Sequence, residues 1–255
     1  MPFTRFIMDD WVIWAPASPA RSGAWSSLGS FRLDERHLLD LARDWLGHRG
    51  YRVLKSDESS LVETKRIEID RTPIEVVVKS PKLGGGFKRW LRLYRPARVV
   101  RTLDKTLKLQ SIGVACEYPV FAMERRHRGR LLDQLFLAER VPGTTLAAFD
   151  LDSISNDARK ALLMACGQSL ADIERRGWTH FDAKTTNWIV FADANSHVPV
   201  LIDCDGMRTY RWRGAGIQRL IRALSQHPAH RQADIEALLS GYQRRLSTAD
   251  SSIVR

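Results

Sequence analysis

The chain has 255 residues, a length that suits one or two domains with a sizeable core. Apolar residues make up 44% and charged residues 27%, so the composition is globular and excludes a disordered or fibrous protein. No stretch of the sequence approaches the roughly 20 apolar residues of a membrane-spanning helix. Asp9 and Asp10 interrupt the apolar N-terminus before a signal-peptide core can form, which argues against secretion.

Three cysteines lie far apart, at Cys116, Cys166 and Cys204. Their spacing does not fit a metal site, and their odd number does not fit a disulfide framework. We therefore expect reduced, mostly buried thiols, as in a reducing cytoplasm.

Positive charge is concentrated in one segment. The net charge is +11, and residues 79–108 contain ten basic side chains against one acid, Asp104. Such a block predicts an anionic partner: nucleic acid, an anionic membrane surface or a phosphorylated substrate. The alternative is a helix face that is charged only because it is exposed to water.

The first half of the chain is predicted to be rich in strands. Residues 1–33 contain much Ser, Gly, Pro and Trp without clear periodicity, and we expect a leader that is draped over the domain or partly disordered. Apolar spacing then predicts a helix over residues 34–48. Composition and alternation predict strands over residues 51–55, 61–69 and 74–79.

A basic, aromatic segment follows three consecutive glycines, and Pro96 then suits the first turn of a helix that ends near residue 112. Two further strands are predicted over residues 118–123 and 135–141. A very basic turn over residues 125–130 lies between them.

The second half is predicted to be mostly helical. Two strands over residues 187–192 and 198–203 bracket a turn. Periodicity predicts helices over residues 157–176, 215–226 and 232–246. The chain is thus expected to be α+β, with a strand-rich N-lobe over residues 34–140, a small helical C-lobe over residues 141–255 and a cleft between the lobes.

The sharpest feature of the sequence is GWTHFDAKTTNWIVF followed by VLIDCDG. It places an H-x-D-x-K-x-x-N motif, from His180 to Asn187, before one predicted strand, and Asp203 at the end of the next. Phosphoryl transfer from ATP needs a carboxylate beside the attacking hydroxyl and oxygen ligands that hold Mg²⁺ on the phosphates. Asp182 and Asn187 supply both from one loop, and Asp203 completes the metal site.

A lysine on a strand of the other lobe must also reach the phosphates, and Lys79 at the end of IEVVVK fits that place. Each piece alone is weak evidence, because Asp182 can serve as an N-cap or turn residue and an Asp at a strand end is common. The ordered set with the expected elements around it favours a kinase-like protein.

With these motifs the chain resembles the lipopolysaccharide core and Kdo kinases, a divergent branch of the protein-kinase-like fold. The resemblance extends from about Ile74 to Tyr242 and includes KSPKLGGGFKRWLRLYRPARVVRTL and GIQRLIRALSQHP. It implies a bilobal protein-kinase-like fold that uses ATP and Mg²⁺. It also implies that the acceptor is a sugar hydroxyl of a lipopolysaccharide inner-core precursor. Such an enzyme would be cytoplasmic, peripheral at the inner face of the inner membrane.

The resemblance also implies a role for each motif residue. Asp182 would be the catalytic base that accepts the proton of the sugar hydroxyl, and Lys184 would neutralise charge on the transferring phosphoryl group. Asn187 and Asp203 would hold Mg²⁺, with Asp205 as a rival ligand.

In the N-lobe, Lys79 would bind the α/β-phosphates, and the backbone near Glu139 and Val141 would pair with adenine. The fold is expected to provide an acidic partner for the lysine on the following helix, but Thr102 occupies roughly that place and Asp104 is the nearest acid. The loop KSDESSL between the first strands has no glycine to cover the phosphates.

Other functions stay open at this stage. A small-molecule or protein Ser/Thr kinase on the same fold differs from the first hypothesis only in its acceptor. A pseudokinase that binds anionic glycolipid without transferring phosphate is favoured by the missing acidic partner and glycines. It is opposed by the intact Asp182, Asn187 and Asp203.

The basic segment over residues 79–108 has a physical role under the kinase hypothesis. It suits an anionic glycolipid or the anionic inner-membrane surface, and the amphipathic rings of Trp90 and Tyr94 fit a membrane interface. Packing of both rings under the sheet is the alternative. No nucleic acid partner is expected, because no recognised nucleic-acid motif accompanies the segment.

Overall fold

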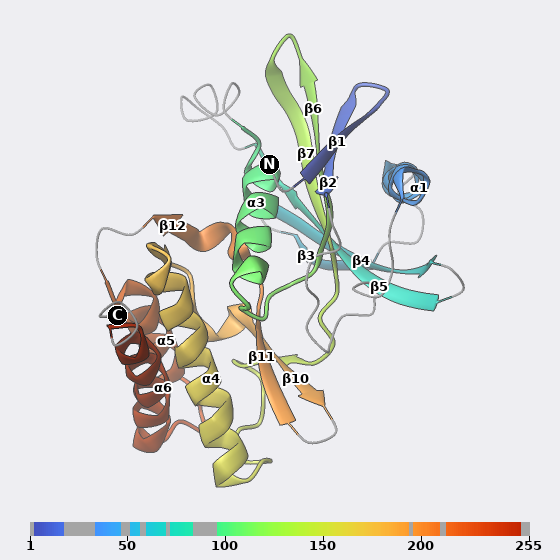
Figure 1. Ribbon diagram of the computed structural model, residues 1–255. Coiled ribbons are helices and arrows are strands. Elements are labelled where there is room, and N and C mark those ends of the chain that lie inside the picture. The colour runs from blue at the N-terminus through green and yellow to red at the C-terminus, as the bar shows by residue number, and fades with distance from the viewer. Residues whose placement is uncertain are drawn as a thin grey trace. The chain divides into compact units, whose positions relative to one another are not determined.

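The chain divides by its internal packing into two compact units. Unit 1 comprises Met1–Lys108 and Glu117–Arg140, and unit 2 comprises Leu109–Cys116 and Val141–Arg255. The predicted α+β class is confirmed, with a strand-rich N-terminal sheet and a helical C-terminal part (Figure 1). A computed structural model describes residues 3–17, 34–46, 52–56, 60–69, 72–83, 96–193, 196–209 and 213–250.

Unit 1 is built on an antiparallel sheet of seven strands in the order β1-β2-β6-β7-β5-β4-β3. In its centre, β5 alternates exposed and buried side chains from Pro73 to Val76, and β7 is buried from Gln134 to Glu139. The strands are β1 (Phe3–Met8), β2 (Trp11–Pro16), β3 (Arg52–Ser56), β4 (Ser60–Ile69), β5 (Thr72–Pro81), β6 (Pro119–His127) and β7 (Arg130–Glu139).

The N-terminal strands correct one expectation. Met8 pairs with Trp11 across a two-residue turn, and Asp9 in that turn has the positive φ of 53° that tight hairpins require. β2 also pairs with β6, so the hairpin is part of the main sheet. The expected lack of regular structure is therefore wrong for residues 3–16 of the leader, and residues 18–33 lie outside the described residues.

Two helices cover opposite faces of this sheet. Trp11 of β2 meets Trp45 of α1 (Glu35–Leu46) edge to face, with ring centroids 6.1 Å apart. Trp14, whose side chain points to the other face, packs against the cluster formed by α3 (Arg98–Ser111), β6 and β7. Because a helix covers each face of the sheet at β2, the side chains of this strand are apolar at almost every position.

The other predicted elements of unit 1 are confirmed with shifts of a few residues, apart from the basic turn. β6 continues to His127 and β7 begins at Arg130, so only Arg128 and Gly129 form the turn. Both residues have positive φ, 48° and 78°, as in a two-residue hairpin. The turn expected over residues 125–130 is therefore mostly strand.

Unit 2 combines three helices with short strands, and the predicted helices are confirmed (Figure 1). Two 3-10 turns, η2 (Thr185–Asn187) and η3 (Cys204–Gly206), flank the hairpin of β10 and β11. The helices are α4 (Asn156–Arg175), α5 (Ala215–Leu224) and α6 (Gln232–Asp250). The strands are β8 (Thr144–Thr145), β9 (Trp178–His180), β10 (Trp188–Asp193), β11 (Ser196–Leu201) and β12 (Met207–Thr209).

α4 and α6 touch backbone to backbone at two glycines. A Cβ on Gly167 would lie 2.1 Å from the carbonyl oxygen of Leu238, and one on Gly241 would lie 2.1 Å from that of Met164. Any side chain at either position would push the helices apart. Glycine is unfavourable inside a helix, so its presence here follows from this close approach.

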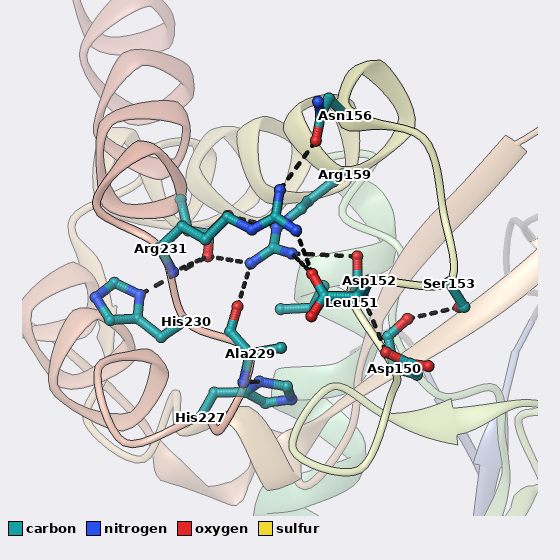
Figure 2. A network of polar contacts seen from close by, with 11 residues as sticks. Asp150, Leu151, Asp152, Ser153, Asn156, Arg159, His227, Ala229, His230 and Arg231 are labelled. Carbon is teal, nitrogen blue, oxygen red and sulfur yellow. Dashed lines mark hydrogen bonds and ion pairs between the residues drawn. The ribbon is translucent and has the colours of Figure 1, made fainter.

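A buried ion pair also joins α4 to α6. Nε and Nη2 of Arg159 donate to the two carboxylate oxygens of Asp234 at 2.7 and 2.6 Å, and both side chains are at most 4% exposed. The guanidinium also donates to Asp152 at 2.8 Å and to the carbonyl oxygen of Ala229 (Figure 2). Burial alone raises the pKa of Asp234, but hydrogen bonds from Arg159 and from the backbone of Arg231 lower it below its ordinary value.

The three cysteines form no disulfide bonds and are buried, as predicted. Burial raises the pKa of the Cys166 thiol far above its ordinary value, so this thiol stays protonated. None of the helices in the described ranges is long and apolar enough to cross a membrane.

Candidate active site

The predicted motif forms a compact loop in unit 2. β9 pairs with β12, and the loop that leaves β9 is tied back by a 3.2 Å hydrogen bond from the Phe181 N–H to the Gly206 carbonyl. A Cβ on Gly206 would lie 2.8 Å from the His180 ring and 3.2 Å from Cβ of Asp182. The glycine of DCDG therefore lets the two loops pack together, and buried His180 supports them.

Three of the predicted site residues meet at one carboxylate. Nδ2 of Asn187 donates to the backbone oxygen of Asp182 at 2.8 Å and to its Oδ2 at 3.1 Å. Nζ of Lys184 lies 3.1 Å from the same Oδ2. Asn187 is buried, whereas Asp182 and Lys184 are more than a third exposed, so the carboxylate is held in place and still reachable from solvent.

Asp203 lies at the same end of the β10–β11 hairpin as Asn187. The N–H of Ile202 donates to the Asn187 carbonyl at 2.9 Å, and Asp203 follows directly. Asp203 has φ 58° and ψ 55°, a left-handed conformation uncommon for residues with a side chain, and its carbonyl lies 3.2 Å from Nε2 of His180. Strained backbone held by a buried ring is typical of functional sites.

The donor set fits Mg²⁺ bound together with phosphates. The Asn187 amide nitrogen is used by Asp182, which leaves the amide oxygen as its ligand atom. An amide oxygen and the Asp203 carboxylate are hard ligands, the kind Mg²⁺ takes alongside substrate phosphates. In the described ranges no group of three or more His, Cys, Asp or Glu side chains is placed to hold a metal ion.

The acidic partner of Lys79 exists, but it comes from another place in the chain. Nζ of Lys79 lies 2.7 Å from Oε2 of Glu117, whose side chain is only 4% exposed. Thr102 instead donates to a backbone carbonyl of its own helix, and Asp104 pairs with Lys108. The expectation of an acidic partner on α3 was therefore wrong. The partner lies just before β6, after that helix has ended.

The backbone around the predicted adenine contact shows which groups are already used. The N–H of Glu139 donates to the Tyr118 carbonyl at 2.9 Å, and that of Arg140 donates to the Glu75 carbonyl at 2.8 Å. Across the described residues, no acceptor is found for the N–H of Val141. Val141 therefore keeps a donor for a ligand, whereas the N–H of Glu139 is already used.

One residue near Asp182 was not identified from the sequence. Nη2 of Arg219, on α5, lies 3.8 Å from Oδ1 of Asp182. Arg219 belongs to the quoted tail IQRLIRAL, where its spacing from Leu220 and Leu224 indicated only an amphipathic helix. Its position beside Asp182 depends on tertiary packing, and no local pattern predicts it.

Comparison with known proteins decides the family. The model of the lipopolysaccharide kinase (Kdo/WaaP) family matches residues 88–242, more than half of the chain. The chain belongs to this family of kinases. A solved structure described as WaaP in complex with acyl carrier protein is similar over 79% of this chain and 82% of that one, with a TM-score of 0.56 and 21% identity. That likeness confirms the predicted kinase-like fold. No curated protein matches the sequence.

Proposed function

We propose that this family member transfers the γ-phosphate of ATP to a sugar hydroxyl of a lipopolysaccharide inner-core precursor. The observation that carries the proposal is the cluster around Asp182, where Asn187 and Lys184 fix one carboxylate oxygen and leave the other for a substrate. This is the arrangement that phosphoryl transfer needs: a positioned base beside a cation that balances phosphoryl charge. The family match supports the substrate class.

In this reaction Asp182 accepts the proton of the sugar hydroxyl as its oxygen attacks the γ-phosphorus. Lys184 neutralises charge on the phosphoryl oxygens. Asn187 and Asp203 would hold Mg²⁺, which supplies charge neutralisation on the ATP phosphates. Asp203 is preferred to Asp205 because it directly follows the segment bonded to Asn187.

Lys79 of unit 1 and the chain segment from Glu139 to Val141 would bind the rest of the nucleotide. Lys79 would contact the α/β-phosphates, with Glu117 fixing its ammonium group. The carbonyl of Glu139 and the N–H of Val141 would pair with adenine. We therefore treat unit 1 as the nucleotide-binding lobe and unit 2 as the lobe that carries the base and the metal ligands.

The pseudokinase alternative is weakened by the Lys79–Glu117 pair, since the missing acidic partner was one of its two supports. Its other support, a glycine-free loop, falls largely on residues 57–59, which lie outside the described residues. ATP binding without transfer to any acceptor would restore that alternative.

We also propose that the enzyme works peripherally at the inner face of the inner membrane, through the basic segment over residues 79–108. Within it, Arg98 and Arg101 are exposed on α3, whereas Trp90, Tyr94 and the rest of 84–95 lie outside the described residues. Exposed cations near an anionic surface contribute about 1 kcal/mol each. Binding to vesicles with anionic lipid, lost on Arg98→Glu with Arg101→Glu and absent with neutral vesicles, tests this.

The kinase reaction is tested by transfer of γ-labelled phosphate from Mg-ATP to a lipopolysaccharide precursor that lacks core phosphate. Asp182→Ala and Asp203→Ala should abolish labelling. Exposed Glu236 on α6 provides the control, and Glu236→Ala should label as wild type does. Transfer that survives in Asp182→Ala would overturn the assignment of the base.

A further inference from the structure

The two oxygens of the Asp182 carboxylate have different neighbours. Oδ2 contacts Asn187 and Lys184, each at 3.1 Å, whereas Oδ1 lies 3.8 Å from Nη2 of Arg219. Asn187 is the proposed metal ligand and Lys184 the proposed phosphoryl contact. The Oδ2 side is therefore the phosphate side, and an acceptor hydroxyl reaches Oδ1, the side on which Arg219 lies.

The helix that carries Arg219, α5, is held against α4 and against the loop that contains Asp182. Buried Glu174 accepts hydrogen bonds of 3.0 and 3.1 Å from the N–H of Gly214, just before α5. In the first turn of α5, a Cβ on Gly216 would lie 3.3 Å from the carbonyl oxygen of His180. Arg219 follows one turn later. Its position beside Asp182 is therefore set by packed backbone.

Two cationic side chains lie within 4 Å of this one carboxylate. Lys184 and Arg219 bring two positive charges against one negative charge on Asp182. Arg219 is 42% exposed and its ion pair is long, so the contact contributes little and is easily exchanged. A guanidinium in that position can take a carboxylate or phosphate in a stronger, two-bond contact.

We infer that Arg219 binds an anionic group that the acceptor sugar carries beside its reacting hydroxyl, and thereby selects acidic acceptors; this rests on the proposed kinase reaction. The hydroxyl proton passes to Oδ1 of Asp182, the new O–P bond forms, and the bond from the γ-phosphorus to the bridging oxygen breaks, so that ADP leaves with the electron pair. Arg219 takes no proton and forms no covalent bond. It orients the acceptor so that its hydroxyl faces Oδ1.

The test compares acceptors that differ only in charge. One pair is lipid A carrying Kdo with its carboxylates free or methyl-esterified. A second pair is a heptose-extended precursor with or without an existing phosphate. Wild type should prefer the anionic member of one pair by about 10- to 100-fold in kcat/KM, mainly through KM, as expected for hydrogen bonds to a charged group. The pair that shows the preference identifies the group as carboxylate or phosphate.

Arg219→Gln should reduce that preference to about one, and Arg219→Lys should leave an intermediate value. Arg222, exposed on the same helix, gives the matched control, and Arg222→Gln should keep the full preference. Thermal unfolding checks that both glutamine variants are folded.

Three outcomes overturn the inference alone: no charge preference in wild type, an unchanged preference in Arg219→Gln, or an equal loss on both members of a pair, which marks a structural role. Failure of wild type to label any acceptor would instead refute the proposed function itself, and this inference with it.

Discussion

Two arginine–aspartate contacts in unit 2 are built in opposite ways. Arg159 and Asp234 are 4% and 3% exposed and share two hydrogen bonds of 2.6 and 2.7 Å. Arg219 and Asp182 are 42% and 38% exposed and lie 3.8 Å apart. The same two residue types therefore form a closed contact between α4 and α6 and an open one beside the catalytic loop.

The difference separates stability from chemistry. A buried charge that loses its partner costs several kcal/mol, so the first pair must stay closed in the folded protein. An exposed, long pair contributes about 0 to 1 kcal/mol and can be replaced by charges of a substrate. We expect mutations in the first pair to change folding and mutations in the second to change catalysis.

The largest expected effect comes from breaking the closed pair. Arg159→Met leaves Asp234 buried without its cation and should lower the free energy of unfolding by about 3 to 5 kcal/mol, measured by urea denaturation. Arg175→Met on the same helix, where the partner Asp172 lies 3.4 Å away at the surface, should stay within about 1 kcal/mol of wild type. Similar losses in both variants would erase the distinction.

Removing the carboxylate of the open pair should act on the reaction. Asp182→Asn keeps the size of the side chain but removes the proposed base, so labelled phosphate transfer should fall by about 10²- to 10⁴-fold. Its urea denaturation curve should match that of wild type within about 1 kcal/mol, because the side chain is more than a third exposed. Loss of stability in this variant would instead mean that Asp182, like Asp234, is needed for folding.

The buried partner of Lys79 should combine both kinds of effect. Glu117→Gln removes the negative charge that fixes the ammonium group, and we expect a rise of about 10-fold in the KM for ATP. The matched control is Asp104→Asn, which breaks an exposed ion pair with Lys108 on α3. Unchanged nucleotide binding in Glu117→Gln would mean that the Lys79–Glu117 pair only stabilises unit 1.

The close contact between α4 and α6 gives a further test of stability. Gly241→Ala places a Cβ against the backbone of Met164 and should cost about 1 to 3 kcal/mol of stability. Gly113→Ala is the comparison, since space is open there and only its positive φ of 81° resists the change. An unchanged unfolding temperature of Gly241→Ala in calorimetry would mean that the two helices can move apart without loss of stability.

The smallest expected effect is a pH dependence of the closed pair. The pKa of Asp234 is lower in the folded state than in the unfolded state. Its contribution to the free energy of unfolding is therefore complete above the unfolded-state pKa of about 4, and it is lost as the pH falls through the lower folded-state pKa. The difference in the free energy of unfolding between wild type and Asp234→Asn should therefore narrow as the pH falls below about 4. A difference that grows on acidification would contradict this sign.

Local patterns predicted much of the fold and of the site. Alternation and helical spacing located most strands and helices, and the five-residue step from Asp182 to Asn187 lies within one loop, so its geometry follows from the sequence. The hairpin over residues 3–16 was missed although its signal was present: two short β-rich runs around Asp9 and Asp10. Those aspartates were interpreted as an interruption of an apolar run and are in fact the turn.

The missed site residues depend on long-range packing. Glu117 reaches Lys79 because β5 and the segment before β6 meet across unit 1. Arg219 reaches Asp182 because α5 packs against His180 through a glycine. Neither contact has a periodic or spacing signal, since the residues involved are far apart in sequence.

The most direct single measurement is the rate of labelled phosphate transfer per folded molecule for Asp182→Asn and Asp234→Asn. We predict that Asp182→Asn is folded and nearly inactive, whereas Asp234→Asn has fewer folded molecules that each transfer phosphate at close to the wild-type rate. Transfer by folded Asp182→Asn at the wild-type rate would contradict the assignment of Asp182 as the base.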